Sequence, residues 1–519
     1  MDSLRRWARC LAIGFTALPA LSALVSCAVG PDFHTPAAPS VAQYTAGTQP
    51  PGTAAADSPQ GAAQRFDAGA MVPVDWWTRF GSPGLDRLVA DALAASPTLV
   101  AAVAKLRQAQ EDYAARAGGT RWPSADLNLS AKRQQVDLAS FGITSVPNPG
   151  PFSLYNASVD VSYTLDIFGA NRRTLEGLAA QTDYARFQWE AARLALAANV
   201  VTAAIRRASL RAQLSAAEGA LAAQTQQLSI TQERLSAGGV AQLDVENQQS
   251  LVAQTAATLP ALRQQIAQLD HQLALYLGQP PGTFASPELT LHSLQLPEDL
   301  PLVLPSALAR RRPDVRASEA LLHRASADVG VATANLYPRF TLTGSFGSQR
   351  TRAADLADSV NVWNIGMSLL QPIFRGGQLR AERRSAVAAY DAALANYQQT
   401  VLQGFVQVAD ALRTLESDAQ TLQARSEAAT RADRAWRISE ARYRAGGISQ
   451  LALLDAQRQA LDTARAQREA QGARLADTAA LFQALGGGWQ ETDHPAASAP
   501  ASSTRHSTSD ATGARFNAD

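Results

Sequence analysis

Long stretches of this chain place apolar residues at helical spacing and contain few aromatic side chains. Between Ala241 and Leu277 the large apolar residues recur every three or four positions, which predicts a helix with a narrow, coiled-coil-like stripe. Pro260 interrupts this run, and because an interior proline removes a backbone hydrogen bond, we expect a bend or a break there. The stripe consists of Leu262, Ile266, Leu269, Leu273 and Leu277.

A second helix is predicted to precede this one and to turn back into it. It runs from about Leu210 to Ser236 and ends at Gly238 and Gly239, because glycine supplies the positive φ that tight turns and helix ends favour. The second half of the chain repeats this pattern with a helix to Arg444, a turn at Gly446 and Gly447, and a helix from Leu451 to Leu485. Each half therefore contains a long helical hairpin.

The two halves are copies of one module. Matching positions are Gly238 and Gly446 at an offset of 208, Ile167 and Ile373 at 206, and Pro123 and Pro338 at 215. Because the offset changes so little, the whole module is duplicated, unlike the short units of a solenoid. We expect the repeats to cover 73–281 and 282–489, each in the order helix, strand, strand, helical hairpin.

The N-terminus has the features of an export signal, with three arginines before an apolar stretch from Leu11 to Leu24. Residues 24–27, Leu-Val-Ser-Cys, resemble a bacterial lipobox, so we expect removal of 1–26 and lipidation of Cys27; a plain cleaved signal is the alternative. Ala28 in the next position, where no Asp stands, favours sorting to the outer membrane. Residues 27–72 are predicted to form a lipid-anchored extended leader, and 490–519 a disordered tail.

Four further segments alternate apolar and polar residues, which predicts β-strands with one face of each kind. Each is about ten residues long, the length that a tilted strand needs to cross a bilayer. The connections within the two pairs, 133–152 and 349–361, are long and polar, as loops outside a membrane are. The segments are Ala125–Lys132, Asn156–Leu165, Phe340–Phe346 and Trp363–Leu369.

The number of strands limits what they can build. Backbone groups in lipid must all be paired, so four open strands cannot span a bilayer alone. Two chains would give eight strands and a filled cylinder, whereas three would give twelve and leave a lumen for the polar faces. We therefore expect a homotrimer, with long helices continuing into the periplasm. The alternative is a soluble sheet whose apolar face packs on the helices.

Composition argues against several other classes of protein. The chain of 519 residues has a net charge of +1, so no nucleic-acid partner is expected. Its six histidines and two cysteines lack metal-ligand spacing, and there is no GxSxG, HExxH or phosphate-binding glycine loop. We expect no catalytic residue, cofactor or metal, and hence not an enzyme.

Several strings resemble one family, the TolC/OprM (NodT-type) outer-membrane efflux lipoproteins. They are RRPDVRASEA (311–320), YPRFTLTGSFG (337–347), QPIFRGGQLRAE (371–382), YQQTVLQGFVQVADAL (397–412) and LGGGW (485–489). The resemblance implies a mixed α and β membrane protein: a trimeric twelve-stranded barrel continued by an α-helical periplasmic tunnel with a small equatorial region. It also implies the exit duct of a tripartite pump, with a periplasmic adaptor and an inner-membrane RND-type transporter as partners.

The resemblance also implies a gate at the periplasmic tip of the tunnel. Asp455 matches the aspartate of the narrowest ring, and Asp244 and Tyr443 match a hydrogen-bonding pair that holds neighbouring hairpins together. Ile448 and Ala452 stand where the best-studied relative has an arginine and a second ring aspartate, so a second acidic ring is left open. The alternatives are a solvated helix residue for Asp455 and a core aromatic for Tyr443. The two glycine turns are assigned to adaptor docking.

Two interpretations stay open at this point. A periplasmic adaptor would also combine a lipid anchor with a helical hairpin, but it would carry one hairpin within β-rich modules rather than two hairpins and four membrane-length strands. The basic run Arg310–Arg312 is a functional patch or, more simply, salt-bridged surface near the waist. The cargo is not encoded in a duct, so drugs, solvents, metal ions and siderophores are all compatible with the sequence.

Overall fold

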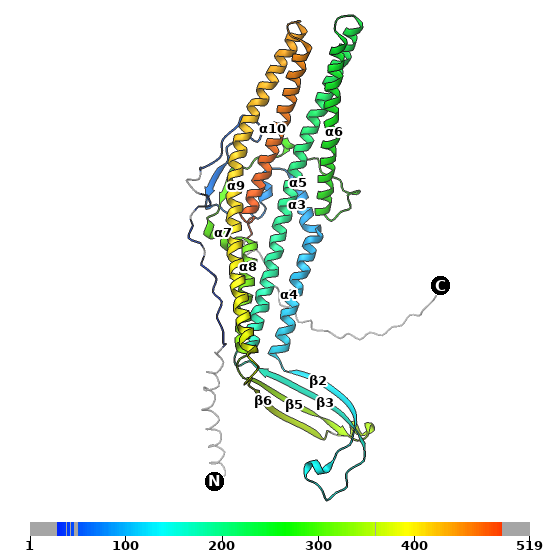
Figure 1. Ribbon diagram of the computed structural model, residues 1–519, viewed down its shortest axis with the longest axis vertical. Helices are drawn as coiled ribbons and strands as arrows, with labels where there is room; N and C mark the ends of the chain where they lie inside the picture. Colours follow the sequence, from blue (N-terminus) through cyan, green and yellow to red (C-terminus); the bar gives the residue numbers. More distant parts are fainter. Residues whose placement is uncertain (1–27, 38, 42, 46–49, 359, 490–519) are drawn as a thin grey trace, which may run out of the picture.

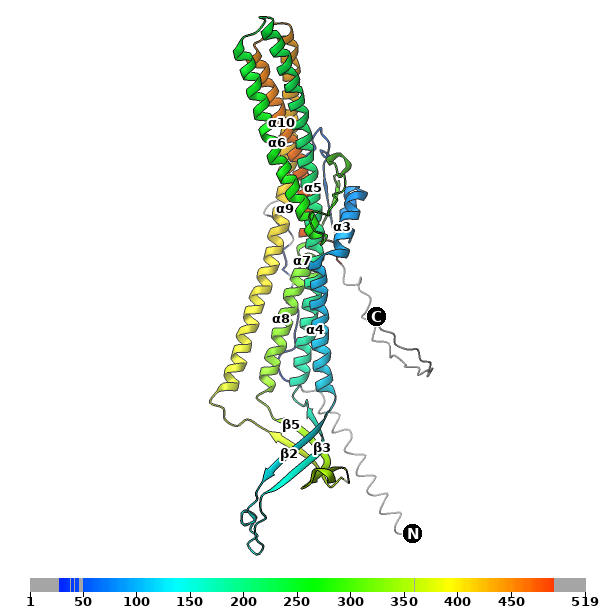
Figure 2. The same ribbon diagram turned by 90° about the vertical axis from the view of Figure 1, so that its right-hand side faces the viewer.

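The computed structural model describes residues 28–37, 39–41, 43–45, 50–358 and 360–489. The export signal, Cys27 and the predicted tail lie outside these residues. The described chain is elongated, with a sheet at one end and two helical hairpins reaching the other (Figures 1 and 2). Shorter elements surround the middle of the long helices, which we call the equator.

The two halves have the same order of elements. The first contains α4 (Pro97–Arg121), β2 (Ser124–Gln134), β3 (Phe152–Leu165), α5 (Ala170–Ser236) and α6 (Gln242–Tyr276). The second contains α8 (Pro313–Ala334), β5 (Arg339–Arg350), β6 (Val362–Leu370), α9 (Gln378–Arg444) and α10 (Gln450–Ala484). Since α5 and α9 both have 67 residues and α6 and α10 both have 35, the offset of 208 holds along both hairpins.

The predicted start of the first long helix was wrong. Helix α5 begins at Ala170, not near Leu210, and at 1.5 Å per residue its 67 residues extend about 100 Å. Its middle, from Leu196 to Ala208, is buried on nearly all sides by α3 (Pro83–Ala95) and the equatorial elements. Because a helix buried all round has no polar face, it shows no amphipathic period from which its length could be predicted.

Pro260 does not break α6, which is continuous from Gln242 to Tyr276. The proline lies on the exposed side of the helix, so water can hydrate the carbonyl that lacks its usual N–H partner. Leu259 and Leu262 on the other side pack with Ala217 of α5. Packing of this face keeps the helix intact across the proline.

The four predicted strands form one antiparallel sheet in the order β2-β3-β5-β6. Within it Val161 of β3 lies opposite Gly344 of β5, and Asp126 opposite Asp160. The sheet extends away from the helices, and its apolar side chains are exposed in the single chain. The alternative of a soluble sheet packed on the helices is therefore wrong.

The leader follows the body from the sheet to the equator. It begins where the N–H of Val29 donates to the carbonyl of Phe168 (3.1 Å), and Asp32 then pairs with Arg173 (2.7 Å). Further along, Tyr44 donates to the carbonyl of Val303 (2.6 Å). The leader also contributes β1 (Arg65–Ala68), which pairs in parallel with β4 (Asp299–Leu302) and was not predicted.

The equator holds the main apolar core. Trp76, in the 3-10 helix Trp76–Phe80, is fully buried and stacks on Phe482 of α10 at 5.4 Å between ring centroids. Helices α3 and α7 (Pro305–Arg311) flank this core. Further 3-10 helices lie at Leu138–Phe141, Leu291–Ser293 and Ala353–Ala357.

Candidate functional site: the tips of the two hairpins

The turns of both hairpins lie at the end of the molecule farthest from the sheet (Figure 1). Gly238 and Gly446 each have φ 73°, in the left-handed region that glycine favours. The N–H of Gly239 donates to the carbonyl of Arg234 (2.7 Å), and that of Gly447 to the carbonyl of Arg442 (2.8 Å). A side chain at Gly238 or Gly446 would contact no neighbour, so backbone conformation alone requires glycine there.

Asp244 and Tyr443 lie close together but do not bond to each other directly. A carboxylate oxygen of Asp244 accepts from the N–H of Ala241 (3.1 Å) and so caps the start of α6. The Tyr443 hydroxyl donates to Oε1 of Gln450 (3.2 Å), and Nε2 of Gln450 donates to the backbone carbonyl of Asp244 (3.0 Å). Gln450 therefore joins the two residues and holds the second hairpin to the first.

Arg234 strengthens this contact from the first hairpin. Its Nη1 lies 3.4 Å from the Tyr443 hydroxyl, and its guanidinium lies 5.6 Å from the centre of the tyrosine ring. The interhelical contact at the tip is thus a chain of polar groups from Arg234 through Tyr443 and Gln450 to Asp244. We call these four residues the tip cluster.

Sequence analysis missed Gln450. Its counterpart at the offset of 208 is another glutamine, Gln242, so the repeat gave no signal of a special role. Gln450 is only 5% exposed, whereas Gln242 is exposed and donates to Glu246 in its own helix (2.9 Å). Only the neighbouring hairpin distinguishes the two positions.

Asp455 projects from α10 one turn beyond the hairpin turn. Its side chain is 61% exposed and pairs with Arg458 at 2.9 Å. The counterparts in the first hairpin are Asn247 and Ser250, so both charges are specific to the second. Arg458 was not predicted, and it offsets part of the negative potential expected from Asp455.

A second polar cluster lies near the equator, at positions whose counterparts in the first hairpin are apolar (Leu210, Ile266 and Leu269). Arg474 is fully buried and donates to the Thr53 hydroxyl (3.0 Å) and the Ala62 carbonyl (2.7 Å), which fastens the leader to α10. Burial, together with the adjacent Asp477 carboxyl, raises the pKa of Asp418 to about 7, while the positive charge of Arg474 opposes this rise. We call Asp418, Arg474 and Asp477 the equatorial charge cluster.

The basic run Arg310–Arg312 is not simply salt-bridged surface. Arg310 and Arg311 are exposed, but Arg312 is only 6% exposed. Its guanidinium donates to Asp314, to Gln407 of α9 and to the carbonyl of Ala484 at the end of α10 (2.7 Å for each of the closest contacts). It therefore ties α8 to the second hairpin and has a structural role.

No single helix of the described residues is long and apolar enough to span a bilayer; α3 and α4 meet that test only as a pair bent by 42°.

The fold combines two pairs of antiparallel strands with two long helical hairpins. Comparison with known proteins shows which family has this fold. Residues 88–279 and 304–487 match the family model of the outer membrane efflux protein. The chain belongs to this family and is an outer-membrane efflux channel that extends into the periplasm, so the adaptor interpretation is not favoured.

Individual relatives agree with this assignment. The chain is 35% identical over 435 residues to the pyoverdine export outer membrane protein OpmQ of Pseudomonas aeruginosa, covering 83% of this chain and 90% of that one. It is 30% identical to the outer membrane protein OprJ of the same species, over 92% and 97% of the two chains. The solved outer-membrane channel OprN superposes with a TM-score of 0.78 at 30% identity, over 89% of this chain and 99% of that one.

Proposed function

We propose that three copies form one continuous duct, a twelve-stranded barrel followed by a helical tunnel. The open sheet carries this proposal, because its apolar face is exposed: Leu127 is 69% and Ile365 74% exposed in the single chain. Such a face suits lipid, and lipid requires every backbone group to be paired. Twelve strands leave a lumen that the opposite, polar face would line.

The lumen is gated at the hairpin tips, where three symmetry-related copies of Asp455 approach one axis. Carboxylates crowded around an axis repel one another and attract cations, so the ring favours cation passage over a rigid lock. Arg458 moderates that potential. The tip cluster, with Asp244 and Tyr443 joined by Gln450, keeps the two hairpins of one chain together while the tunnel is closed.

The turns at Gly238–Gly239 and Gly446–Gly447 dock a periplasmic adaptor, which connects the duct to an inner-membrane transporter of the RND type. Support comes from the exposed leucines just after the turns, Leu243 (68%) and Leu451 (57%), which occupy the same repeat position. A trimer would present six such leucines in a ring. A helical-hairpin adaptor with apolar positions at its own tip fits that ring.

Cys27 is the lipid anchor in the outer membrane. Support comes from the lipobox-like residues 24–27 and from Ala28, which lies beside the strand–helix junction where Val29 bonds to Phe168. Acyl labelling should be lost in Cys27→Ala while some folded trimer remains. Labelling that persists would exclude the anchor.

The exported compounds are small molecules toxic to the cell. Besides the pyoverdine export protein OpmQ, the relatives include outer membrane proteins of a toluene efflux pump and of an antibiotic efflux pump in Pseudomonas putida, so cargo varies among them. Deleting the gene should sensitise cells to such compounds, and the wild-type gene should restore resistance. A strain whose susceptibility to a broad panel is unchanged would contradict export of toxic compounds.

A complementation assay separates docking from folding. Leu243→Asp with Leu451→Asp should fail to restore resistance although the trimer forms, because the apolar ring is lost. Leu275→Asp is the matched control, since Leu275 is equally exposed (70%) on α6 but lies at the equator. Full rescue by the first variant would argue against docking at the tips.

A further inference from the structure

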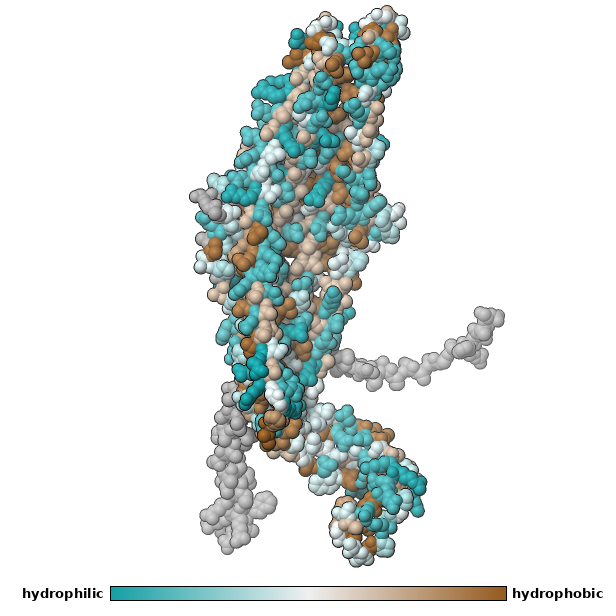
Figure 3. All heavy atoms as spheres, in the orientation of Figure 1, coloured by the Kyte–Doolittle hydropathy of each residue, from teal (hydrophilic) through white to brown (hydrophobic). Residues whose placement is uncertain are grey.

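The described sheet has two open edges, β2 on one side and β6 on the other. The helices repeat this arrangement, because α4 lies beside α5, α5 beside α8, and α8 beside α9, so α4 and α9 are the outer members. Each edge exposes apolar side chains, among them Trp122 (72%) before β2 and Phe374 (87%) after β6. Figure 3 shows hydrophobic atoms gathered where the helical body meets the sheet.

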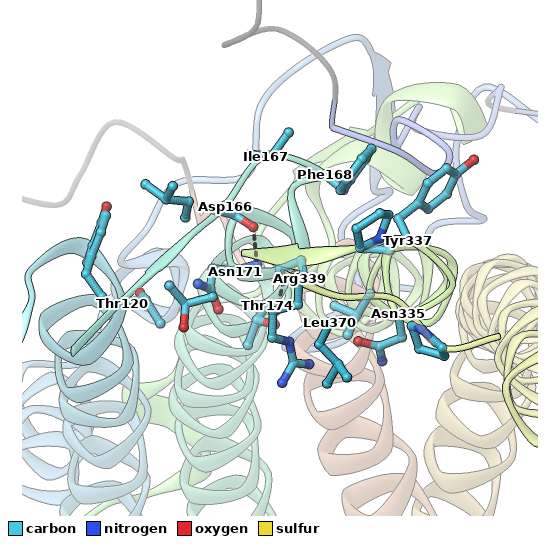
Figure 4. Close-up of a pocket in the computed structure, with 18 of the residues that line it drawn as sticks. Thr120, Asp166, Ile167, Phe168, Asn171, Thr174, Asn335, Tyr337, Arg339 and Leu370 are labelled. Atoms are coloured by element: carbon cyan, nitrogen blue, oxygen red, sulfur yellow. Dashed lines mark hydrogen bonds between the residues drawn. The ribbon is translucent and has the colours of Figure 1, made fainter. Parts of the chain in front are cut away.

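The contact between the two repeats within one chain, which we call the internal joint, indicates how the open edges could pair. There β3 pairs with β5, with Val161 opposite Gly344. Between the strands and the helices Phe168 lies beside Tyr337 (Figure 4). The two rings stack, with centroids 4.8 Å apart and planes 21° apart. Helix α5 packs on α8 beside this stack.

The internal repeat relates the internal joint to the open edges. Strand β3 is equivalent to β6 at an offset of 206, since Ile167 corresponds to Ile373, and β5 is equivalent to β2 at an offset of 215, since Pro338 corresponds to Pro123. The equivalent of Val161 is therefore Met367, and the equivalent of Gly344 is Leu129. The register taken from the internal joint keeps apolar residues opposite apolar residues, with Leu369 opposite Leu127 and Ile365 opposite Ala131.

The same equivalence gives the exposed aromatic residues a partner. The repeat equivalent of Phe168 is Phe374, and that of Tyr337 is Trp122. The two rings exposed at opposite edges of the chain therefore correspond to the two rings that stack inside it. An aromatic pair of this kind stabilises a contact beyond the effect of the area that it buries.

Charge on the outer helices is complementary as well. In the internal joint Gly177 of α5 lies next to Ala327 and Asp328 of α8. At an offset of 216, set by Pro97 and Pro313, the α8 pair corresponds to the exposed acidic pair Glu111–Asp112 of α4. At an offset of 208, Gly177 corresponds to Ser385, which directly follows the exposed basic pair Arg383–Arg384 of α9.

We propose that each joint between subunits repeats the joint within the chain: β6 pairs antiparallel with β2 of a second copy, Met367 lies opposite Leu129 of the partner subunit, and Phe374 stacks on Trp122 of the partner subunit. The inference rests on the proposed trimer and adds its register and its aromatic contact. A shift by one residue would turn one strand's apolar side chains to the polar face.

Disulfide trapping in outer-membrane vesicles tests the register. The full sequence has only Cys10, in the predicted signal, and Cys27, so background cross-linking is low. Leu129→Cys with Met367→Cys should form covalent dimers and trimers on mild oxidation, because directly opposite residues approach within disulfide range. Asn128→Cys or Leu127→Cys with Met367→Cys are the matched controls, and we expect them to cross-link at least several-fold less.

Two outcomes separate this inference from the proposed trimer. If the native mass shows a trimer but a shifted pair cross-links better, the register is wrong and the trimer stands. If the native mass shows another oligomer, the proposed duct itself fails. A trimer that cross-links best through Leu129 and Met367 supports both.

A double-mutant cycle tests the aromatic contact without cysteines. Phe374→Ala and Trp122→Ala should each lower the temperature at which the trimer dissociates in detergent, and the double variant should lose no more than the larger single loss. Ile373→Ala is the control, since Ile373 is 96% exposed beside Phe374 and corresponds to Ile167 rather than to the stacked ring. Additive losses would overturn the stack.

Discussion

The two hairpin tips have the same backbone and different chemistry. Both turn through a glycine at φ 73°, and their helices have equal lengths. At the first tip Gln242 is exposed and Asn247 is uncharged, whereas the second tip carries the buried Gln450 and the exposed acidic group of Asp455. Pairs that differ at the offset of 208 include Leu235 and Tyr443, Asp244 and Ala452, Asn247 and Asp455, and Ser250 and Arg458. Duplication thus gives two hairpins with the same backbone, and departures from it give the second tip polar contacts of its own.

The glutamines show why position in the repeat does not decide a role. Gln242 and Gln450 begin α6 and α10 in the same way, yet only Gln450 reaches the other hairpin of its own chain. Within one chain the second hairpin meets Asp244 of the first, and the equivalent position is Ala452. The hydroxyl that donates to Gln450 belongs to Tyr443, and the equivalent residue of the first hairpin is Leu235, which has no donor to offer Gln242.

The largest effect is expected from making the second hairpin apolar at the equator. Arg474→Ile copies the first-hairpin residue Ile266. It removes the buried guanidinium that donates to the leader and the positive charge that acts on Asp418, which should cost about 3–5 kcal/mol of stability, because the loss of a buried charged donor leaves its partners unsatisfied. Thermal unfolding and protease cleavage of the leader measure this.

A triple variant is the control for that loss. Asp418→Leu and Asp477→Leu, added to Arg474→Ile, reproduce the apolar residues Leu210 and Leu269 of the first hairpin and should recover much of the stability. If Arg474→Ile alone is as stable as wild type, the equatorial charge cluster does not stabilise the contact between the leader and α10.

A smaller effect is expected when the acidic ring is removed. Asp455→Asn makes the second tip resemble the first, and purified trimers in a planar bilayer should lose cation preference several-fold, with a higher conductance where cation binding had slowed passage. Asn247→Asp should strengthen the preference if its side chain also faces the axis. Unchanged conductance and selectivity in Asp455→Asn would remove Asp455 from the gate.

A weaker effect is expected in the tip cluster. Gln450→Ala removes two hydrogen bonds, each worth about 1 kcal/mol, and should raise the frequency of spontaneous opening by roughly an order of magnitude. Gln242→Ala is the matched control, because the same residue is exposed in the first hairpin and should leave opening unchanged. Equal effects of the two variants would contradict a latch at Gln450.

A further effect is a dependence of stability on pH. The folded-state pKa of Asp418, about 7, lies above its ordinary value of 3.8, so the folded protein holds this proton more tightly than the unfolded chain does. Stability from this group is complete below about pH 4 and is lost as pH rises through about 7. In Asp418→Asn the melting temperature should depend less on pH between about pH 4 and pH 7. The counterpart in the first hairpin, Leu210, has no titratable group. A slope that survives the substitution would place the titration elsewhere.

The sequence predicted those parts of the fold that have a periodic signal. Strict alternation located all four strands of the sheet, and the glycine pairs located both turns. The buried middle of α5 and the β1–β4 pair escaped prediction, because burial on nearly all sides removes helical periodicity and a four-residue strand has too few positions to alternate. Gln450 and Arg474 escaped because their roles arise from contacts with segments distant in sequence.

The start of the leader has a consequence for how deep the protein lies in the membrane. Val29 is hydrogen-bonded to Phe168, just after the end of β3. Acyl chains on the proposed anchor Cys27, two residues earlier, would therefore enter lipid at that level and set the depth of the protein. The 14 residues of β3 extend about 46 Å at 3.3 Å each, more than a tilted strand needs to cross an apolar band about 25 Å tall. With the lower level set at Phe168 by the proposed anchor, the surplus would rise above the outer leaflet. The polar ends of the strands, at Lys132–Gln134 and Gln349–Arg350, would then form a collar standing in water outside the cell.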